Sequence, residues 1–342
     1  MASVGRYEPA PWFARQDVLT RDMQPVIEPI TGPESLFAVV LAAVLLVFFG
    51  RRILVKPVGA ALLAMAIVAI GIVVFAHPSV VVAALAPDNL PVLGLLILLG
   101  GFTWLALWQA VQTDNRGGVC RSADEHDVKF FTWPDLIYSE LVCGLAVMAF
   151  LIAWSLLAPA PLEEPANPML TPNPAKAPWY FVGLQEILFY CDGWMAGLAI
   201  PVLAVVGLLA IPYLDRNPRG SGYYTIDARP FAYLVFQLGF WLLGVLPIVV
   251  GAFFRGPNWG FGARDTAVST ATAGPAAGVG PLGGVFWLAY FLVAPLVVAC
   301  LVPRGMRAQM GRARQVLLAV LLSAMLAVPL RMVFHWASAG RL

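Results

Sequence analysis

The sequence has 342 residues, of which 60% are hydrophobic and only 12% charged, with a mean hydropathy of +0.82 and a formal net charge of +2. A soluble domain of this length would have about a quarter of its residues charged, so this composition excludes an ordinary water-soluble protein. The small net charge and the absence of basic blocks argue against a nucleic-acid partner. We therefore expect an all-α integral membrane protein surrounded by membrane lipid.

The chain begins with a polar segment, residues 1–33, which lacks the short apolar core of a signal peptide. A bilayer core about 30 Å thick requires roughly 20 apolar residues in a helix. Eight later runs satisfy this requirement and predict about eight transmembrane helices: 34–50, 57–76, 90–111, 136–158, 193–213, 230–254, 282–302 and 315–335. A shorter run, 79–86, is interpreted as a re-entrant or interfacial piece, and Pro201 and Pro247 predict local kinks within their spans.

Successive predicted loops are alternately rich and poor in Lys and Arg. Loops 51–56, 112–135, 214–229 and 303–314 are rich in them, whereas loops 77–89, 159–192 and 255–281 are poor. Because basic loops stay on the cytoplasmic side, this alternation predicts that both termini lie on the periplasmic side of a bacterial inner membrane.

Histidine bears on whether the chain binds haem itself. Transmembrane b-type haems need axial ligands, most often histidines, that project from helices at matched depth. The only histidines are His77, His126 and His335, and no two of them share a helix face. We expect no haem to be ligated by this chain, and each histidine to be an ordinary polar residue near the membrane surface.

The predicted outer loop 159–192 is rich in proline and then turns into a periodic apolar stretch. Pro178 suits the first turn of a helix, and Trp179 to Tyr190 predicts a helix too short to cross a bilayer, which should lie along the interface. Trp179, Val182, Gly183 and Glu186 fall on one face of it. Such a face could form a flat slot with a proton acceptor, or it could hold only an interfacial aromatic residue and a solvated carboxylate.

The sequence from Trp133 to about Phe261 resembles subunit IV of cytochrome bf complexes, which is equivalent to the C-terminal part of cytochrome b. The resemblance rests on WPDLIY at 133–138, LEEPANP at 162–168, TPNPAKAPWYF at 171–181 and the basic loop DRNPRG at 215–220. In that family the outer loop carries a Pro-Glu-Trp-Tyr motif that lines the quinol-oxidation site. The resemblance implies that Pro178, Trp179, Tyr180, Val182 and Gly183 border a quinone.

The motif departs from the family at one decisive position. It is Ala177-Pro178-Trp179-Tyr180 here, so proline replaces the glutamate that accepts a quinol proton. Glu186, two helical turns later on the Trp179 face, is the candidate replacement as general base. Asp192 is a weaker alternative, and Glu164 matches a family loop residue with a structural role.

A second site is implied on the inner side, where the family's counterpart of WPDLIY lies near the quinone-reduction site. Asp135, Tyr138 and Glu140 are the candidates for quinone binding and proton uptake there. Acidic residues that enter a span are costly and usually functional, although at the end of a span they can also simply cap the helix.

The sequence thus predicts four regions: a polar segment at 1–33, three extra helices at 34–124, a subunit IV-like core at 125–262, and a loop with two further helices at 263–342. The resemblance implies a non-haem subunit of a quinol:cytochrome c oxidoreductase that binds ubiquinone or menaquinone. Its partners would be a dihaem cytochrome b N-terminal-like subunit, a Rieske iron–sulfur protein and a c-type cytochrome. The alternatives are a multi-helix transporter or channel, and a structural anchor for cytochromes.

Overall fold

The computed structural model describes residues 32–75, 89–115, 131–157, 169, 175–214, 225–227, 229–256, 259, 281–308 and 310–339, and every element within them is helical. The polar segment 1–31, the short run 79–86, Glu164 and most of loop 255–281 lie outside the described residues. The predicted all-α fold class is confirmed. Six helical segments among the described residues are long and apolar enough to cross a membrane: Pro33–Leu54, Leu90–Asn115, Thr132–Leu157, Met195–Leu214, Pro230–Phe254 and Arg312–Ala337.

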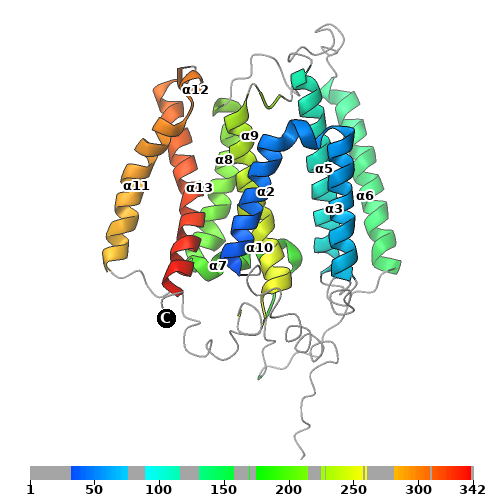
Figure 1. Ribbon diagram of the computed structural model, residues 1–342, viewed down its shortest axis with the longest axis horizontal. Coiled ribbons are helices and arrows are strands. Elements are labelled where there is room, and N and C mark those ends of the chain that lie inside the picture. Colours follow the sequence, from blue (N-terminus) through cyan, green and yellow to red (C-terminus); the bar gives the residue numbers. More distant parts are fainter. Residues whose placement is uncertain are drawn as a thin grey trace, which may run out of the picture.

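A helix occupies each of the eight predicted spans. The first four spans contain α2 (Pro33–Leu54), α3 (Pro57–Phe75), α5 (Leu90–Asn115) and α6 (Ile137–Leu157), the last preceded by the π-helical turn η1 (Thr132–Leu136). The other spans contain η2 (Met195–Ala199) with α8 (Ile200–Leu214), then α9 (Pro230–Leu238), and finally α11 (Pro281–Leu301) and α13 (Arg312–Ala339). The short α12 (Arg304–Ala308) lies in the predicted loop between the last two spans. The spanning helices run side by side (Figure 1).

The two predicted prolines coincide with irregular helix geometry. Pro247 lies in the short α10 (Leu246–Val249), between the π-helical segments η3 (Gly239–Val245) and η4 (Val250–Phe254), and Pro201 is the second residue of α8, which begins where η2 ends. Proline removes one backbone donor and crowds the preceding turn, so the helix must change its hydrogen-bond register nearby.

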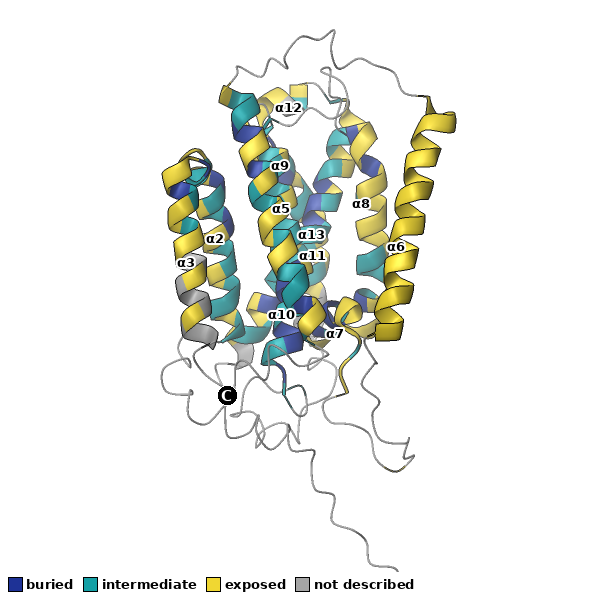
Figure 2. Cartoon of the chain, turned by 90° about the vertical axis from the view of Figure 1, so that its right-hand side faces the viewer, coloured by how far each residue is buried: buried dark blue, intermediate teal, exposed yellow. Residues whose placement is uncertain are grey.

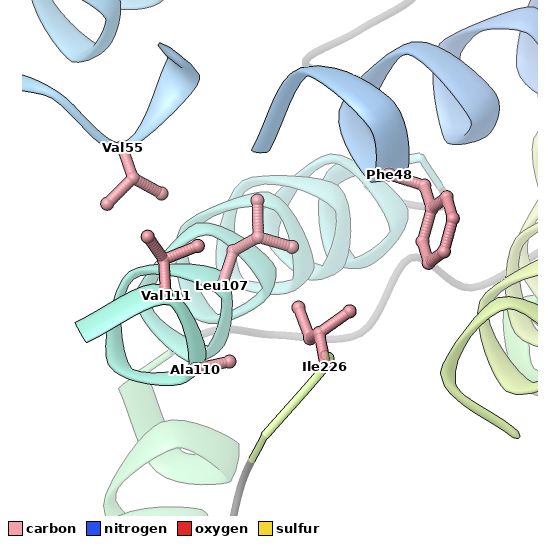
Figure 3. Packing of buried hydrophobic residues seen from close by; sticks show 6 residues of the cluster. All are labelled: Phe48, Val55, Leu107, Ala110, Val111 and Ile226. Carbon is pink, nitrogen blue, oxygen red and sulfur yellow. The ribbon is translucent and has the colours of Figure 1, made fainter. Parts of the chain in front are cut away.

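Most of the helical surface is apolar and exposed, as a lipid-facing protein requires. The buried residues form several small clusters rather than one core. Every described residue of η1 and α6 is exposed, so this helix stands apart from the others (Figure 2). One small cluster joins α2 and α5 to Ile226, whose side chain lies between Phe48 and Ala110 (Figure 3).

The two ends of the bundle differ in charge. The α2–α3 turn, the beginning of α9 and α12 lie at one end, which we call the basic end, and α7 (Trp179–Tyr190) lies at the other (Figure 1). Most of the described Lys and Arg residues are at the basic end: Arg51, Arg52, Lys56, Arg229, Arg304, Arg307, Arg312 and Arg314. Those at the α7 end are Lys176, Arg255 and Arg331.

Candidate functional site

The helix α7 spans Trp179–Tyr190, the bounds predicted from the sequence. Pro178 is its N-cap, and its carbonyl accepts hydrogen bonds from the backbone N–H groups of Phe181 and Val182. The side chain of Gln185 fixes the incoming chain, because its Oε1 accepts from the N–H of Ala177 at 2.7 Å and its Nε2 donates to the carbonyl of Ala175 at 2.8 Å. The start of α7 is therefore held rigidly against its own loop.

One face of α7 packs against the end of the 230–254 helix. Its buried residues are Val182, Gly183, Glu186, Ile187 and Tyr190. A Cβ atom on Gly183 would lie 2.7 Å from Cγ1 of Ile248, and one on Gly251 would lie 2.9 Å from Cγ2 of Val182. The two helices thus cross closely enough to require glycine on both sides, as in other membrane helix pairs.

The opposite face of α7 is aromatic and exposed. Trp179, Tyr180 and Phe181 are 37%, 58% and 56% exposed, and Leu188 and Phe189 continue the surface at 41% and 36%. The rings of Trp179 and Tyr180 lie edge to face, with centroids 5.6 Å apart. Of the predicted quinone-binding residues, Trp179 and Tyr180 are therefore available to a ligand, whereas Val182 and Gly183 lie beneath them against the neighbouring helix.

Glu186 lies at the centre of a buried polar group that we call the Glu186 cluster: Glu186, Tyr190, Arg255 and Trp259. Its Oε2 accepts from Nε of Arg255 at 2.8 Å and from Nε1 of Trp259 at 3.0 Å, and its Oε1 accepts from Nη2 of Arg255 at 2.6 Å. The phenol of Tyr190 donates to the same Oε1 at 3.0 Å. Glu186 and Arg255 are 1% and 5% exposed, so this is a buried, bidentate ion pair.

The backbone of Trp259 has an unusual conformation that lets this residue hydrogen-bond to the cluster. Trp259 has a φ of 59°, a left-handed conformation that a bulky side chain rarely adopts. In that conformation its N–H donates to the carbonyl of Gly256, while its own carbonyl accepts from Nη1 of Arg255 at 2.9 Å. The local cost, of order 1–3 kcal/mol, is offset because one residue contributes both a donor and an acceptor to the ion pair.

Helix α13 closes the cluster from the other side. Nε of Arg331 donates to the backbone carbonyl of Tyr190 at 2.9 Å, and Nε1 of Trp336 donates to its phenol oxygen at 3.4 Å. The ring of His335 lies edge-on to the rings of Phe189 and Tyr190, at 5.1 and 5.3 Å between centroids. The cluster therefore joins three segments that are far apart in the sequence.

These contacts limit what each group can do chemically. Both carboxylate oxygens of Glu186 already accept two hydrogen bonds, so a substrate hydroxyl can reach either oxygen only by displacing one of these donors. Burial, together with the nearby Glu186 carboxylate, raises the pKa of the Tyr190 phenol well above its usual range, so this phenol stays protonated. The cluster thus fixes α7 to the Arg255–Trp259 segment and to α13, and the aromatic face of α7 lies on the side away from it.

The predicted inner-side residues lie far from this cluster. Asp135 in η1 and Tyr138 and Glu140 in α6 are exposed, at the basic end of the bundle (Figure 1). The ring of Trp133 is stacked with that of Tyr138, at 6.1 Å between centroids. No group of three or more His, Cys, Asp or Glu side chains suitable for a metal ion occurs among the described residues.

Five residues of this region were not predicted from the sequence as site residues: Tyr190, Arg255, Trp259, Arg331 and Trp336. One signal was available for Arg331, which interrupts an apolar run long enough to span a bilayer, where charged residues usually have a partner. Nothing in the local sequence indicated that Arg255 would pair with Glu186.

The family model described as Cytochrome b(C-terminal)/b6/petD matches residues 165–251, about a quarter of the chain. This match confirms the resemblance inferred from the sequence motifs. The matched segment contains α7, α8 and most of the 230–254 helix, whereas Arg255, Trp259 and all of α13 lie beyond it. No solved structure matches the chain.

Proposed function

We propose that this chain is a non-haem membrane subunit of a quinol:cytochrome c oxidoreductase of the cytochrome bc type. The observation that carries the proposal is the match of residues 165–251 to the C-terminal region of cytochrome b, in a segment that includes α7 and its exposed aromatic face. The b haems belong on a dihaem cytochrome b N-terminal-like partner, with a Rieske iron–sulfur protein and a c-type cytochrome as electron acceptors.

In this proposal the exposed face of α7 forms one wall of the quinol-oxidation site. The adjacent, exposed rings of Trp179 and Tyr180 suit the ring of ubiquinol or menaquinol, because an aromatic ligand can pack edge to face or offset-stacked against either of them. Pro178 is the N-cap of α7 and so determines where the helix that carries these rings begins. The close contact of Gly183 with Ile248 determines how near α7 lies to the rest of the bundle. The partner subunit supplies the remaining walls.

The sidedness follows from the charge difference between the two ends. Since basic residues stay in the cytoplasm, the α7 end faces the periplasm of a bacterial inner membrane. The beginning of α2 and the end of α13 lie at the α7 end (Figure 1), which supports the proposal that both termini are periplasmic. Asp135, Tyr138 and Glu140 then lie on the inner side, where they would feed protons to a quinone-reduction site.

Two roles are open to Glu186: the proton acceptor that replaces the missing motif glutamate, and the anchor that fixes α7. The four hydrogen bonds to its carboxylate favour the anchor, because a general base needs an oxygen that the substrate can reach.

Substitution of Tyr180 tests the outer quinol site directly. We expect Tyr180→Leu to reduce kcat/KM for quinol by roughly two- to tenfold, the value of one aromatic contact. The measurement is quinol-dependent cytochrome c reduction by membranes containing equal amounts of the complex. Tyr213→Leu is the matched control, because Tyr213 is 71% exposed but lies at the end of α8 remote from α7. Equal activity of the two variants would contradict the proposed site.

A further inference from the structure

A second site of a different kind lies at the basic end, between the α2–α3 turn and the end of α5. A cavity of about 340 Å³ opens there. It is lined by one group of charged and polar residues, one pair of tryptophans and a few small apolar residues: Arg52, Val55, Lys56, Pro57, Ala60, Trp104, Trp108, Val111, Gln112 and Asn115.

The wall of this cavity is positively charged. Arg52 and Lys56 both line it, and the described residues provide no acidic partner for the Lys56 ammonium. Asp227 is shared between Arg51 at 2.8 Å and Arg52 at 2.5 Å, so it neutralises only one of these two charges. Asp114 is already bound by the hydroxyl of Thr225 and by the backbone N–H groups of Ile226 and Asp227. The cavity therefore has an excess of positive charge that favours binding of an anion.

Beyond this cavity, the same face of α5 continues as an exposed apolar strip. Trp104 and Trp108 line the cavity, and Gly101 and Ile97 extend their face by a further two turns, at helical spacing. Ile97 is 68% exposed, and no atom of the described residues lies within 4 Å of where a Cβ atom on Gly101 would be. An open apolar strip of this kind leads directly out of a cationic cavity, which is the shape of a phospholipid: an anionic head with a hydrocarbon chain.

We infer that this cavity binds the phosphate headgroup of an anionic phospholipid, with one acyl chain lying along the Trp104–Gly101–Ile97 face of α5. Basic pockets between membrane helices on the cytoplasmic side bind such headgroups, and tryptophan is enriched at the level of the headgroups. A soluble phosphate would satisfy Arg52 and Lys56 equally well, but it would make no use of the apolar strip. The site lies outside residues 165–251 and does not depend on the proposed redox role.

Binding can be measured on the purified full chain in nanodiscs of phosphatidylcholine with a minor fraction of phosphatidylglycerol, by native mass spectrometry of retained lipid. We expect selective retention of phosphatidylglycerol. Lys56→Gln should weaken it by roughly fivefold, the effect of one basic charge near a membrane surface. Arg304→Gln, which removes an exposed charge at the same end but outside the cavity, should leave retention unchanged.

A second variant separates lipid from free anion. Gly101→Leu fills the open strip without touching any described atom, so the helix should fold normally. It should reduce retention of phosphatidylglycerol and leave any displacement by inorganic phosphate unaffected. Wild-type retention in Lys56→Gln would overturn the site. Full displacement by inorganic phosphate, with no effect of Gly101→Leu, would overturn the lipid as its occupant.

Discussion

At the scale of single residues, the centre of the molecule is the ion pair between Glu186 and Arg255. Two buried charges lose their hydration on folding, and only excellent geometry with further hydrogen bonds repays that cost. Here the guanidinium is bidentate, and Tyr190 and Trp259 complete the shell of the carboxylate. Removing one partner alone leaves an uncompensated buried charge, which is far more damaging than removing both.

This asymmetry makes a double-mutant cycle informative. We expect Arg255→Met alone to destabilise the protein by about 3–5 kcal/mol, and Glu186→Leu/Arg255→Met to be markedly more stable than that single variant. Thermal unfolding in detergent measures the stability, and quinol turnover of the assembled complex measures the function. If Glu186 is an anchor, the double variant recovers both. A stable double variant without turnover would instead assign the proton acceptor to Glu186.

Tyr190 predicts a dependence of stability on alkaline pH. Because its pKa is raised in the folded state, the folded protein keeps the phenolic proton at pH values where the unfolded chain, with a pKa of about 10, has lost it. The contribution is thus fully present below pH ~10 and is lost as the pH rises above it. Unfolding of Tyr190→Phe across this range should show a weaker alkaline loss than wild type, whereas Tyr180→Phe should follow wild type.

At the scale of elements, the crossing of α7 with the 230–254 helix decides the geometry of the site. Gly183 and Gly251 each admit a side chain of the other helix, so the aromatic face of α7 is held at a fixed height. In a membrane the hydrophobic effect does not drive helix association, and small residues promote it by allowing close van der Waals packing between helices.

Alanine substitutions test this crossing. Gly183→Ala places a Cβ 2.7 Å from a side-chain atom of Ile248 and 3.2 Å from its backbone N. The overpacking should destabilise the protein by about 1–3 kcal/mol. Gly197→Ala is the matched control, because none of the residues that the structure describes has an atom within 4 Å of its Cβ position. It should be neutral or stabilise slightly, since alanine favours helix over glycine. Equal melting temperatures for the two variants would mean that the close crossing is not maintained.

The elements themselves could be predicted well from the sequence, and their partners could not. Each apolar run is bounded by charge, proline or glycine, so the helices were placed within a few residues, and α7 was placed with its exact bounds. The predicted common face of α7 is divided in the structure, because Trp179 is exposed whereas Val182, Gly183 and Glu186 are buried. Periodicity says which residues share a face, but not that Gly251 and Ile248 cover it, nor that Arg255 and Arg331 reach α7 from 69 and 141 residues away.

At the scale of the whole molecule, the chain combines a cytochrome b-like segment with helices that this family match does not cover. The α7 end carries the exposed aromatic face above a buried ion pair, and the basic end carries the cationic cavity and the exposed residues Asp135, Tyr138 and Glu140. The isolated helix α6, exposed along its full length, provides a surface for the dihaem partner in the proposed complex (Figure 2).

The central claim is that this chain works within a haem-containing quinol oxidoreductase. The most direct measurement is purification in mild detergent through a tag on this chain, followed by visible spectra of the haems and mass spectrometry of the co-purifying proteins. We predict that b- and c-type haems and a Rieske-type protein co-purify with the chain, and that quinol reduces the haems. A colourless protein isolated without partners would contradict the claim and favour a transporter or channel instead.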